Sequence, residues 1–332
     1  MSENFDLAKK QYSRVGRGLL IYSLGGVVVQ IVAVFVLMFA KDTLAKDQLF
    51  NLILSIVATF ALAIPLAVLY IRKGERYTFG EGRMLSFKEM LLAFFIMYGV
   101  TFVGGLLGNG VMGLFTLIRH KSFVDPASAM LSGGSPVVFW LQIFMVAIAA
   151  PIMEELLFRK TLIDAVEPFG HGAAIFISAL TFGLAHGNFF QFFYTFGVGL
   201  IFAYIYIKTG RVRNTIILHF LLNVFGGVIP SILQRIAGPD VKVLEGDSIA
   251  ATFRALSESG GKAIPSLVYT VIMLAVEIAG IVLLIVNRKK FKFGTAPRQL
   301  PKGEAMKAAF VNVGMILYLI ICTVTFALMF VE

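Results

Sequence analysis

The chain has little charge, a single cysteine and a single tryptophan. Asp, Glu, Lys and Arg make up 14% of its 332 residues, whereas soluble domains carry about 25%. Cys322, the only cysteine, excludes an intrachain disulfide and a cysteine-based metal cluster. The sequence also lacks the period-two alternation of a membrane β-barrel. Because 58% of the residues are hydrophobic and several apolar runs reach roughly 18 residues or more, the fold class predicted is all-α, a polytopic transmembrane helix bundle.

Nine apolar segments predict about nine membrane spans. The first run follows a long polar lead and has no small-residue cleavage site, so we expect a retained helix and not a signal peptide. We divide the chain into an N-terminal scaffold (1–133), a core that carries the polar motifs (134–235) and a part with an external loop and the last spans (236–332). The predicted spans cover about 17–40, 49–71, 87–118, 136–160, 172–187, 190–208, 214–235, 264–287 and 307–331.

The net charge of +10 indicates orientation and not a nucleic-acid partner. Of the 29 Lys and Arg residues, 21 fall in the segments that are cytoplasmic when the N-terminus is cytoplasmic, and 8 fall in the outer loops. This is the positive-inside bias of membrane proteins. The basic run Arg288, Lys289, Lys290 and Lys292 also suits anionic lipid headgroups, so membrane lipid is an expected partner.

Two acids and a guanidinium interrupt the fourth span, in the sequence EELLFR from Glu154 to Arg159. Ionisable groups within membrane segments are a functional-site hypothesis by default. Glu155 and Arg159 stand four apart with the acid first, which favours an ion pair. Glu154 is then the acid without a local partner, and a raised pKa would suit a general base. The alternative is that both acids lie at the cytoplasmic end of the helix and reach into water.

Two further motifs carry histidines, FGLAH ending at His186 and HFLLN from His219 to Asn223. His219 and Asn223 are four apart and share one helix face. Groups of these types from three helices can bind a water or a metal, abstract a proton and stabilise an oxyanion. Simple counting, however, puts His219 ~8 Å and His186 ~21 Å from the cytoplasmic side. They converge only if the fifth span tilts strongly or begins in the cytoplasm near Pro168.

Pro151 should kink the fourth span and free a backbone carbonyl near this site. For three remaining polar residues we expect mainly structural roles. We expect His171 to be a loop residue, and Asn109 to bond to another helix from a packing face formed by Gly105 and Gly113. Glu277 lies near the middle of the eighth span, where we expect a hydrogen bond to another span or, as the alternative, a second functional acid.

The motifs EExxxR, FxxxH and HxxxN, in this order on three apolar spans, resemble the CPBP family. This family consists of membrane-embedded endopeptidases, among them the type II CAAX prenyl endopeptidases, together with bacterial bacteriocin-processing and immunity (Abi-like) proteins. The resemblance covers about residues 134–235, and all six polar motif positions are present. They are Glu154, Glu155, Arg159, His186, His219 and Asn223.

The resemblance implies intramembrane proteolysis with a glutamate-activated water. Glu154 would be the general base, and His186 would help hold the water. His219 and Asn223 would donate to the oxyanion, while Glu155 and Arg159 brace the site. The substrate would be a membrane-associated peptide or protein, cleaved in some members near a prenylated C-terminus, and the location would be the cell membrane.

Whether a metal takes part stays open at this point. Members of the family have been described both as metalloproteases and as metal-free glutamate enzymes. Glu154, His186 and His219 would make a plausible Zn²⁺ ligand set, in which case Glu155 would have to serve as base. Two other functions remain as alternatives: a non-proteolytic membrane partner or immunity protein, and an ion-coupled transporter that uses Glu154 and Glu277. The transporter is disfavoured because no inverted repeat is visible.

Overall fold

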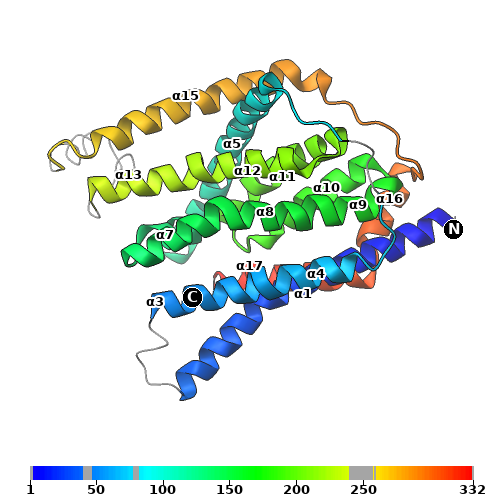
Figure 1. The fold of residues 1–332 in the computed structure, drawn as a ribbon, viewed down its shortest axis with the longest axis horizontal. Helices are drawn as coiled ribbons and strands as arrows, with labels where there is room; N and C mark the ends of the chain where they lie inside the picture. Colours follow the sequence, from blue (N-terminus) through cyan, green and yellow to red (C-terminus); the bar gives the residue numbers. More distant parts are fainter. Residues whose placement is uncertain (1–2, 40–46, 78–81, 239–256, 258, 331–332) are drawn as a thin grey trace.

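The computed structural model describes residues 3–39, 47–77, 82–238, 257 and 259–330, and over these ranges the chain is helical without a strand (Figure 1). The first part comprises α1 (Glu3–Phe39), α3 (Gln48–Ile56), η1 (Val57–Ala63), α4 (Ile64–Ile71), α5 (Phe87–Arg119) and α6 (Pro126–Ser132). The central part comprises α7 (Pro136–Phe144), η2 (Met145–Ala149), α8 (Ala150–Glu155), η3 (Leu156–Thr161), α9 (Leu162–Val166), η4 (Glu167–Phe169), α10 (His171–Ala185), α11 (Phe189–Thr209), α12 (Val212–Asn223), η5 (Val224–Val228) and α13 (Ile229–Ala237). The last part comprises α15 (Ile264–Asn287), η6 (Arg288–Lys290), α16 (Lys302–Phe310) and α17 (Val313–Leu328).

The predicted class, a multi-pass membrane helix bundle, is confirmed. Within the described residues, six helices are long and apolar enough to cross a membrane. The bent pair α16 and α17, which meet at 66°, adds a seventh if it forms one span. The predicted count of nine is therefore not confirmed: the fifth predicted span is the shorter helix α10, and the first lies in α1, part of which falls outside the described side chains. The ninth predicted span is not one continuous helix. It is broken between α16 and α17, because Asn312 caps a new helix by accepting from the Met315 amide.

The segments predicted to be cytoplasmic meet at one end of the bundle, where α4, α9 and α16 end or begin (Figure 1). Backbone hydrogen bonds join them: the Tyr77 amide donates to Asp164, the Arg83 amide to Thr209, and the Arg298 amide to Pro168. These segments carry most of the basic residues, so the charge asymmetry corresponds to a real end of the fold. That this end faces the cytoplasm stays a prediction. The predicted external loop lies largely outside the described residues.

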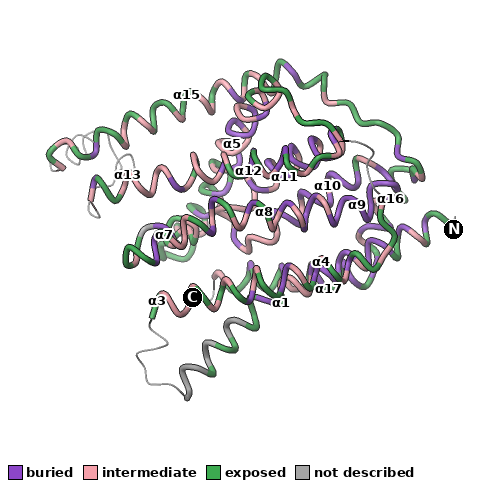
Figure 2. Tube along the Cα trace, in the orientation of Figure 1, coloured by how far each residue is buried: buried purple, intermediate pink, exposed green. Residues whose placement is uncertain are grey.

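The segment that follows the two acids is deeply enclosed by other helices. Leu157, Phe158, Leu162 and Val166 are fully buried, and they pack with α1, α10, α11 and α17. Figure 2 shows this burial along α8, α9 and α10, in contrast to the exposed and half-buried surface of α15. A polar group on the buried side of α8 and η3 is therefore surrounded by protein and not by lipid.

Three π-helical segments each end shortly before a proline, and each has the same cause. At the end of η2 the Ala150 amide donates to Met145, five residues back. The next amide in that ladder would come from Pro151, which has none, so the carbonyl of Val146 is released. Asn223 donates to it at 2.7 Å. The same break recurs at the end of η5, where Pro230 follows and the Tyr269 hydroxyl donates to the released Phe225 carbonyl. The third segment, η1, precedes Pro65.

Glycines bring helices into direct backbone contact, but not at the predicted positions. A Cβ at Gly105 or Gly113 would meet nothing within 4 Å. Gly104 and Gly108, one residue out of register with Gly105, are the pair that packs, against the backbone of α11. Asn109 is correspondingly exposed and donates to the Gly105 carbonyl of its own helix, so the predicted bond to another helix is wrong. The packing row of α5 was misassigned because both rows have the same four-residue spacing.

The tightest crossing joins α1 and α17 at Gly314, whose Cβ, if present, would overlap the Ser13 carbonyl. The Gly314 amide also donates to the Ser13 hydroxyl at 3.2 Å. We expect Gly314→Ala to force these helices apart and to lower the thermal unfolding temperature of the purified protein in detergent by several degrees. Gly110→Ala is the matched control, because it is also a helix glycine and has open space around it. Equal unfolding temperatures for both variants would contradict this reading of the crossing.

Candidate active site

The centre of the polar cluster is an ion pair between Glu155 and Arg159. Both side chains are 0% exposed, and the Arg159 Nε lies 3.3 Å from a Glu155 oxygen. The guanidinium stacks over the Phe182 ring at 4.3 Å from its centroid and lies 5.5 Å from that of Phe202. Among the described residues no hydrogen-bond acceptor with good geometry meets its nitrogens. The aromatic faces therefore supply much of its stabilisation, as expected for cation–π contacts in a dry setting.

His219 of α12 connects the two acids. Its Nδ1 lies 3.0 Å from the second oxygen of Glu155, and its Nε2 lies 3.8 Å from Glu154. A carboxylate only accepts, so the Nδ1 carries the proton, and the Nε2 of a neutral ring is an acceptor facing Glu154. Glu155 is thus bonded to both Arg159 and His219, whereas Glu154 lies 3.8 Å from His219.

Glu154 is the accessible member of the acid pair. Its side chain is 17% exposed, while those of Glu155 and Arg159 are fully enclosed. A hydrogen bond with His219 engages one oxygen of Glu155 and the ion pair with Arg159 engages the other, whereas Glu154 lies 3.8 Å from the His219 Nε2. A water molecule or a substrate can reach Glu154, and neither can reach Glu155.

His186 caps the end of α10 and joins the same cluster. Its Nδ1 lies 2.8 Å from the Phe182 carbonyl, which fixes the proton there and leaves the Nε2 as an acceptor when the ring is neutral. The Phe182 ring contacts both imidazoles, with centroid distances of 5.0 Å to His186 and 5.7 Å to His219. The expected depth conflict is therefore absent, because the Phe182 ring contacts both imidazoles and so places them in one cluster.

Asn223 lies one turn after His219 and is held by the helix that bears the acids. Its amide nitrogen donates one hydrogen to the Val146 carbonyl, the acceptor that Pro151 releases. The predicted freed carbonyl near the site is thus present, and it orients a site residue. An amide nitrogen has two hydrogens, so Asn223 keeps a second one to donate.

The donors present have the chemistry of a metal site but not its geometry. Each histidine has its Nδ1 engaged and its Nε2 unprotonated when neutral, which is the usual state of a metal-binding imidazole. Within the described part of the chain, however, no three His, Cys, Asp or Glu side chains are gathered closely enough to hold a metal ion. Glu154, His186 and His219 therefore form no preformed zinc site, and we derive no step through a metal.

Two of the other polar residues differ from expectation. His171 is not a loop residue, since it begins α10 and its ring lies 2.5 Å from the buried Glu167. Among the described residues, Glu277 makes no side-chain hydrogen bond or ion pair, so the expected bond to another span is not found. The contacts of Phe202 with Arg159 and His219 were not predicted from the sequence.

The fold and the cluster define a class, a multi-pass integral membrane protein with a buried acid and histidine centre. The comparisons with known proteins narrow it. Residues 136–225 match the family model described as type II CAAX prenyl endopeptidase Rce1-like, and they contain all six motif residues. The resemblance drawn from the motifs is confirmed over this segment, which is a little over a quarter of the chain.

Three curated relatives agree with the family match. The chain is 27% identical over 174 residues to a Bacillus subtilis protein named "Putative membrane peptidase YdiL", covering 51% of this chain and 68% of the relative. It is 39% identical over 92 residues to the membrane-embedded CAAX protease MroQ of Staphylococcus aureus, covering 25% and 36%. It is 30% identical over 118 residues to human CAAX prenyl protease 2, covering 29% and 35%. The matches thus span about a third of the last two relatives. No solved structure matches the chain significantly.

Proposed function

We propose that the protein is a membrane endopeptidase of the cell membrane that hydrolyses a peptide bond with a water activated by Glu154. The observation that carries this proposal is that two adjacent acids differ in burial and in bonding. Glu155 is enclosed and bonded to Arg159 and His219, whereas Glu154 is partly exposed beside the Nε2 of His219. An accessible carboxylate beside an oriented imidazole is an arrangement suited to general base catalysis. The family match and the relatives' names support the same reaction class.

Glu154 would take the proton of the attacking water. The Nε2 of His186, an acceptor in the neutral ring, would hold the other hydrogen of that water and so direct its oxygen toward the substrate carbonyl. Because Phe182 contacts both rings, the two imidazoles keep a fixed relation to each other. Glu155 and Arg159 would act indirectly, because Glu155 holds His219 in one tautomer and orientation and Arg159 pairs with Glu155.

The oxyanion would be stabilised by Asn223 and His219. Asn223 has one amide hydrogen left after its bond to Val146. The Nε2 of His219 becomes a donor only when the ring is protonated, and it then lies on the side of the ring that faces Glu154. Preorganised donors in a dry site are typically the largest single contribution to such a reaction. This is the role that the motif resemblance implies, with the added condition on the protonation of His219.

The proposed substrate is a membrane-associated peptide or protein. A prenylated C-terminus is the specific form suggested by the names of the family and of the human relative. We further propose that residues 134–235 act as the catalytic core and that the helices before and after them serve as its scaffold. No nucleic acid partner is proposed, because the positive charge lies in the loops of a membrane protein.

The deciding experiment incubates the purified protein with a panel of labelled peptides, matched in sequence and differing in prenylation. We expect endoproteolytic cleavage of at least the membrane-associated members, detected by mass spectrometry of the products. Preferential cleavage of the prenylated members would establish the narrower substrate class. Running the panel with and without a chelator decides between metal-free and metal-dependent hydrolysis. Absence of cleavage across the panel, with a folded protein, would favour the alternative of a non-proteolytic partner.

A further inference from the structure

A cavity separate from the acid and histidine cluster opens at the basic end of the bundle. It lies between α5, α11 and α15 and has a volume of about 330 Å³. None of the six motif residues lines it. Its deep wall is apolar and comes from side chains within the membrane-spanning helices, namely Leu92, Ala93, Ile96, Ile201 and Ile205. A cavity with such walls at membrane depth suits a hydrocarbon chain.

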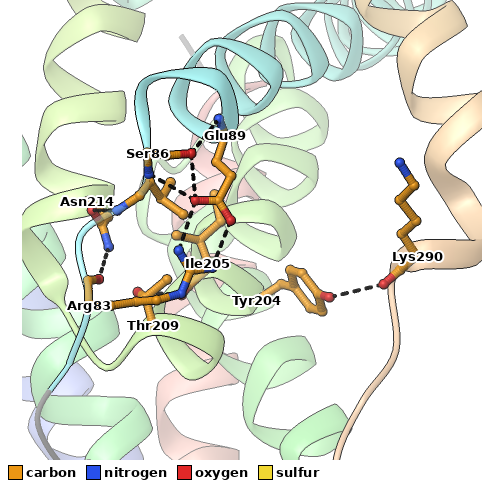
Figure 3. A network of polar contacts seen from close by, with 9 residues as sticks. Arg83, Ser86, Glu89, Tyr204, Ile205, Thr209, Asn214 and Lys290 are labelled. Atoms are coloured by element: carbon orange, nitrogen blue, oxygen red, sulfur yellow. Dashed lines mark hydrogen bonds and ion pairs between the residues drawn. The ribbon is translucent and has the colours of Figure 1, made fainter.

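The mouth of the cavity carries an uneven set of charges. Arg83 is neutralised, because both of its terminal nitrogens lie 2.8 Å from the carboxylate of Glu89, which also accepts from Ser86 (Figure 3). Lys208 and Lys290 also line the cavity, and no acidic side chain of the described residues lies within ion-pair distance of either. The mouth therefore has two uncompensated positive charges above an apolar pocket.

Tyr204 contacts both lysine residues. Its hydroxyl donates to the backbone carbonyl of Lys290 at 3.4 Å (Figure 3). Its ring lies 5.8 Å from the Lys208 ammonium. The ring also packs against Phe291, with a centroid distance of 5.1 Å. Tyrosines of this kind collect where the hydrocarbon region of a membrane meets the headgroups. The apolar pocket and the cationic mouth thus lie at the depths of an acyl chain and of a phosphate.

We propose that this cavity is a binding site for one anionic phospholipid. One acyl chain would occupy the pocket between α5, α11 and α15, and the headgroup phosphate would pair with Lys208 and Lys290. Charge complementarity selects this occupant, because a zwitterionic lipid would bring its own cation to a mouth that is already positive. A free phosphate would leave the apolar walls uncovered. The proposal does not depend on the proposed peptidase activity.

Native mass spectrometry of the full-length protein in detergent tests the site. Delipidated protein is titrated with phosphatidylglycerol and, separately, with phosphatidylcholine of the same acyl chains. We expect the first phosphatidylglycerol to bind at least about tenfold more tightly. The variant Lys208→Gln with Lys290→Gln should lose about 30-fold in that affinity, since each lysine near an anionic headgroup is worth roughly fivefold. Phosphatidylcholine binding should not change.

The control variant is Lys302→Gln with Lys307→Gln, which removes the same charge from exposed positions of α16, outside the cavity. It should bind phosphatidylglycerol like the wild type. Ala93→Phe fills the pocket, and a variant that still unfolds cooperatively should lose the first phosphatidylglycerol site. Inorganic phosphate should not compete. Equal affinity for the two lipids, an equal loss in the control, full binding by folded Ala93→Phe, or displacement by phosphate would each overturn the proposal.

Discussion

Glu154→Gln is expected to reduce peptide turnover by a factor of about 10² to 10⁴ while the protein stays folded. Glutamine keeps the shape of the side chain and removes the basic carboxylate. We expect the site to tolerate the change because Glu154 is partly exposed and its contact with His219 is 3.8 Å long, whereas Glu155 makes the closer bonds to Arg159 and His219. Initial rates on a cleaved peptide and unfolding temperatures in detergent measure the two effects separately.

Glu277→Gln is the matched control for this substitution. Glu277 is the other acid in the middle of a predicted span, and it lies outside the motif cluster. We expect nearly normal turnover from it. Rates close to wild type for Glu154→Gln would eliminate Glu154 as the base. A comparable loss in both variants would instead favour the alternative that Glu277 is a second functional acid.

Arg159→Ala is expected to destabilise the protein by about 3–5 kcal/mol. The substitution leaves the Glu155 carboxylate fully enclosed and removes the one permanently charged cation that pairs with it among the described residues. It also opens a cavity beside the rings of Phe182 and Phe202, which the guanidinium now covers. Chemical unfolding in detergent measures the loss, and turnover should fall with it because Glu155 orients His219.

Arg83→Ala provides the control, since Arg83 also pairs with a glutamate but at a site where the two side chains are 57% and 41% exposed. Exposed pairs of this kind contribute at most about 1 kcal/mol. Replacing both members of the buried pair, as Glu155→Gln with Arg159→Met, should recover part of the stability because no unpaired charge remains inside. An Arg159→Ala protein as stable as the wild type but inactive would mean that Arg159 acts on the substrate.

The local contacts of the site were the easiest to predict. Glu155 and Arg159 are four apart in a helix, and that spacing alone brings them within 3.3 Å. The same four-residue spacing predicts that His219 and Asn223 share one helix face. The released carbonyl before Pro151 followed from the missing amide of proline, although the sequence did not reveal that Asn223 would be its donor. Interactions within one or two turns depend on helix geometry, which is the same in every protein.

Contacts between different helices were harder to predict from the sequence. The packing face of α5 was placed on Gly105 and Gly113, whereas the neighbouring helix meets Gly104 and Gly108. Both rows fit the same periodicity, and only the position of α11 distinguishes them. Counting residues along straight spans likewise set His186 and His219 at different depths. In the structure the Phe182 ring contacts both imidazoles, so the two histidines lie in one cluster.

The sequence by itself determined that this is a multi-pass membrane protein, because hydrophobic length and the rarity of charge depend on composition and order alone. It also determined which six polar residues stand in the motifs and which of them are paired along a helix. Only the tertiary structure decided that His219 bonds to Glu155 and that Glu154 stays accessible. It also decided that Lys208 and Lys290 line the mouth of an apolar cavity. These outcomes depend on how helices distant in sequence rotate and cross, which is set by the sum of many weak packing contacts and by no single residue pattern.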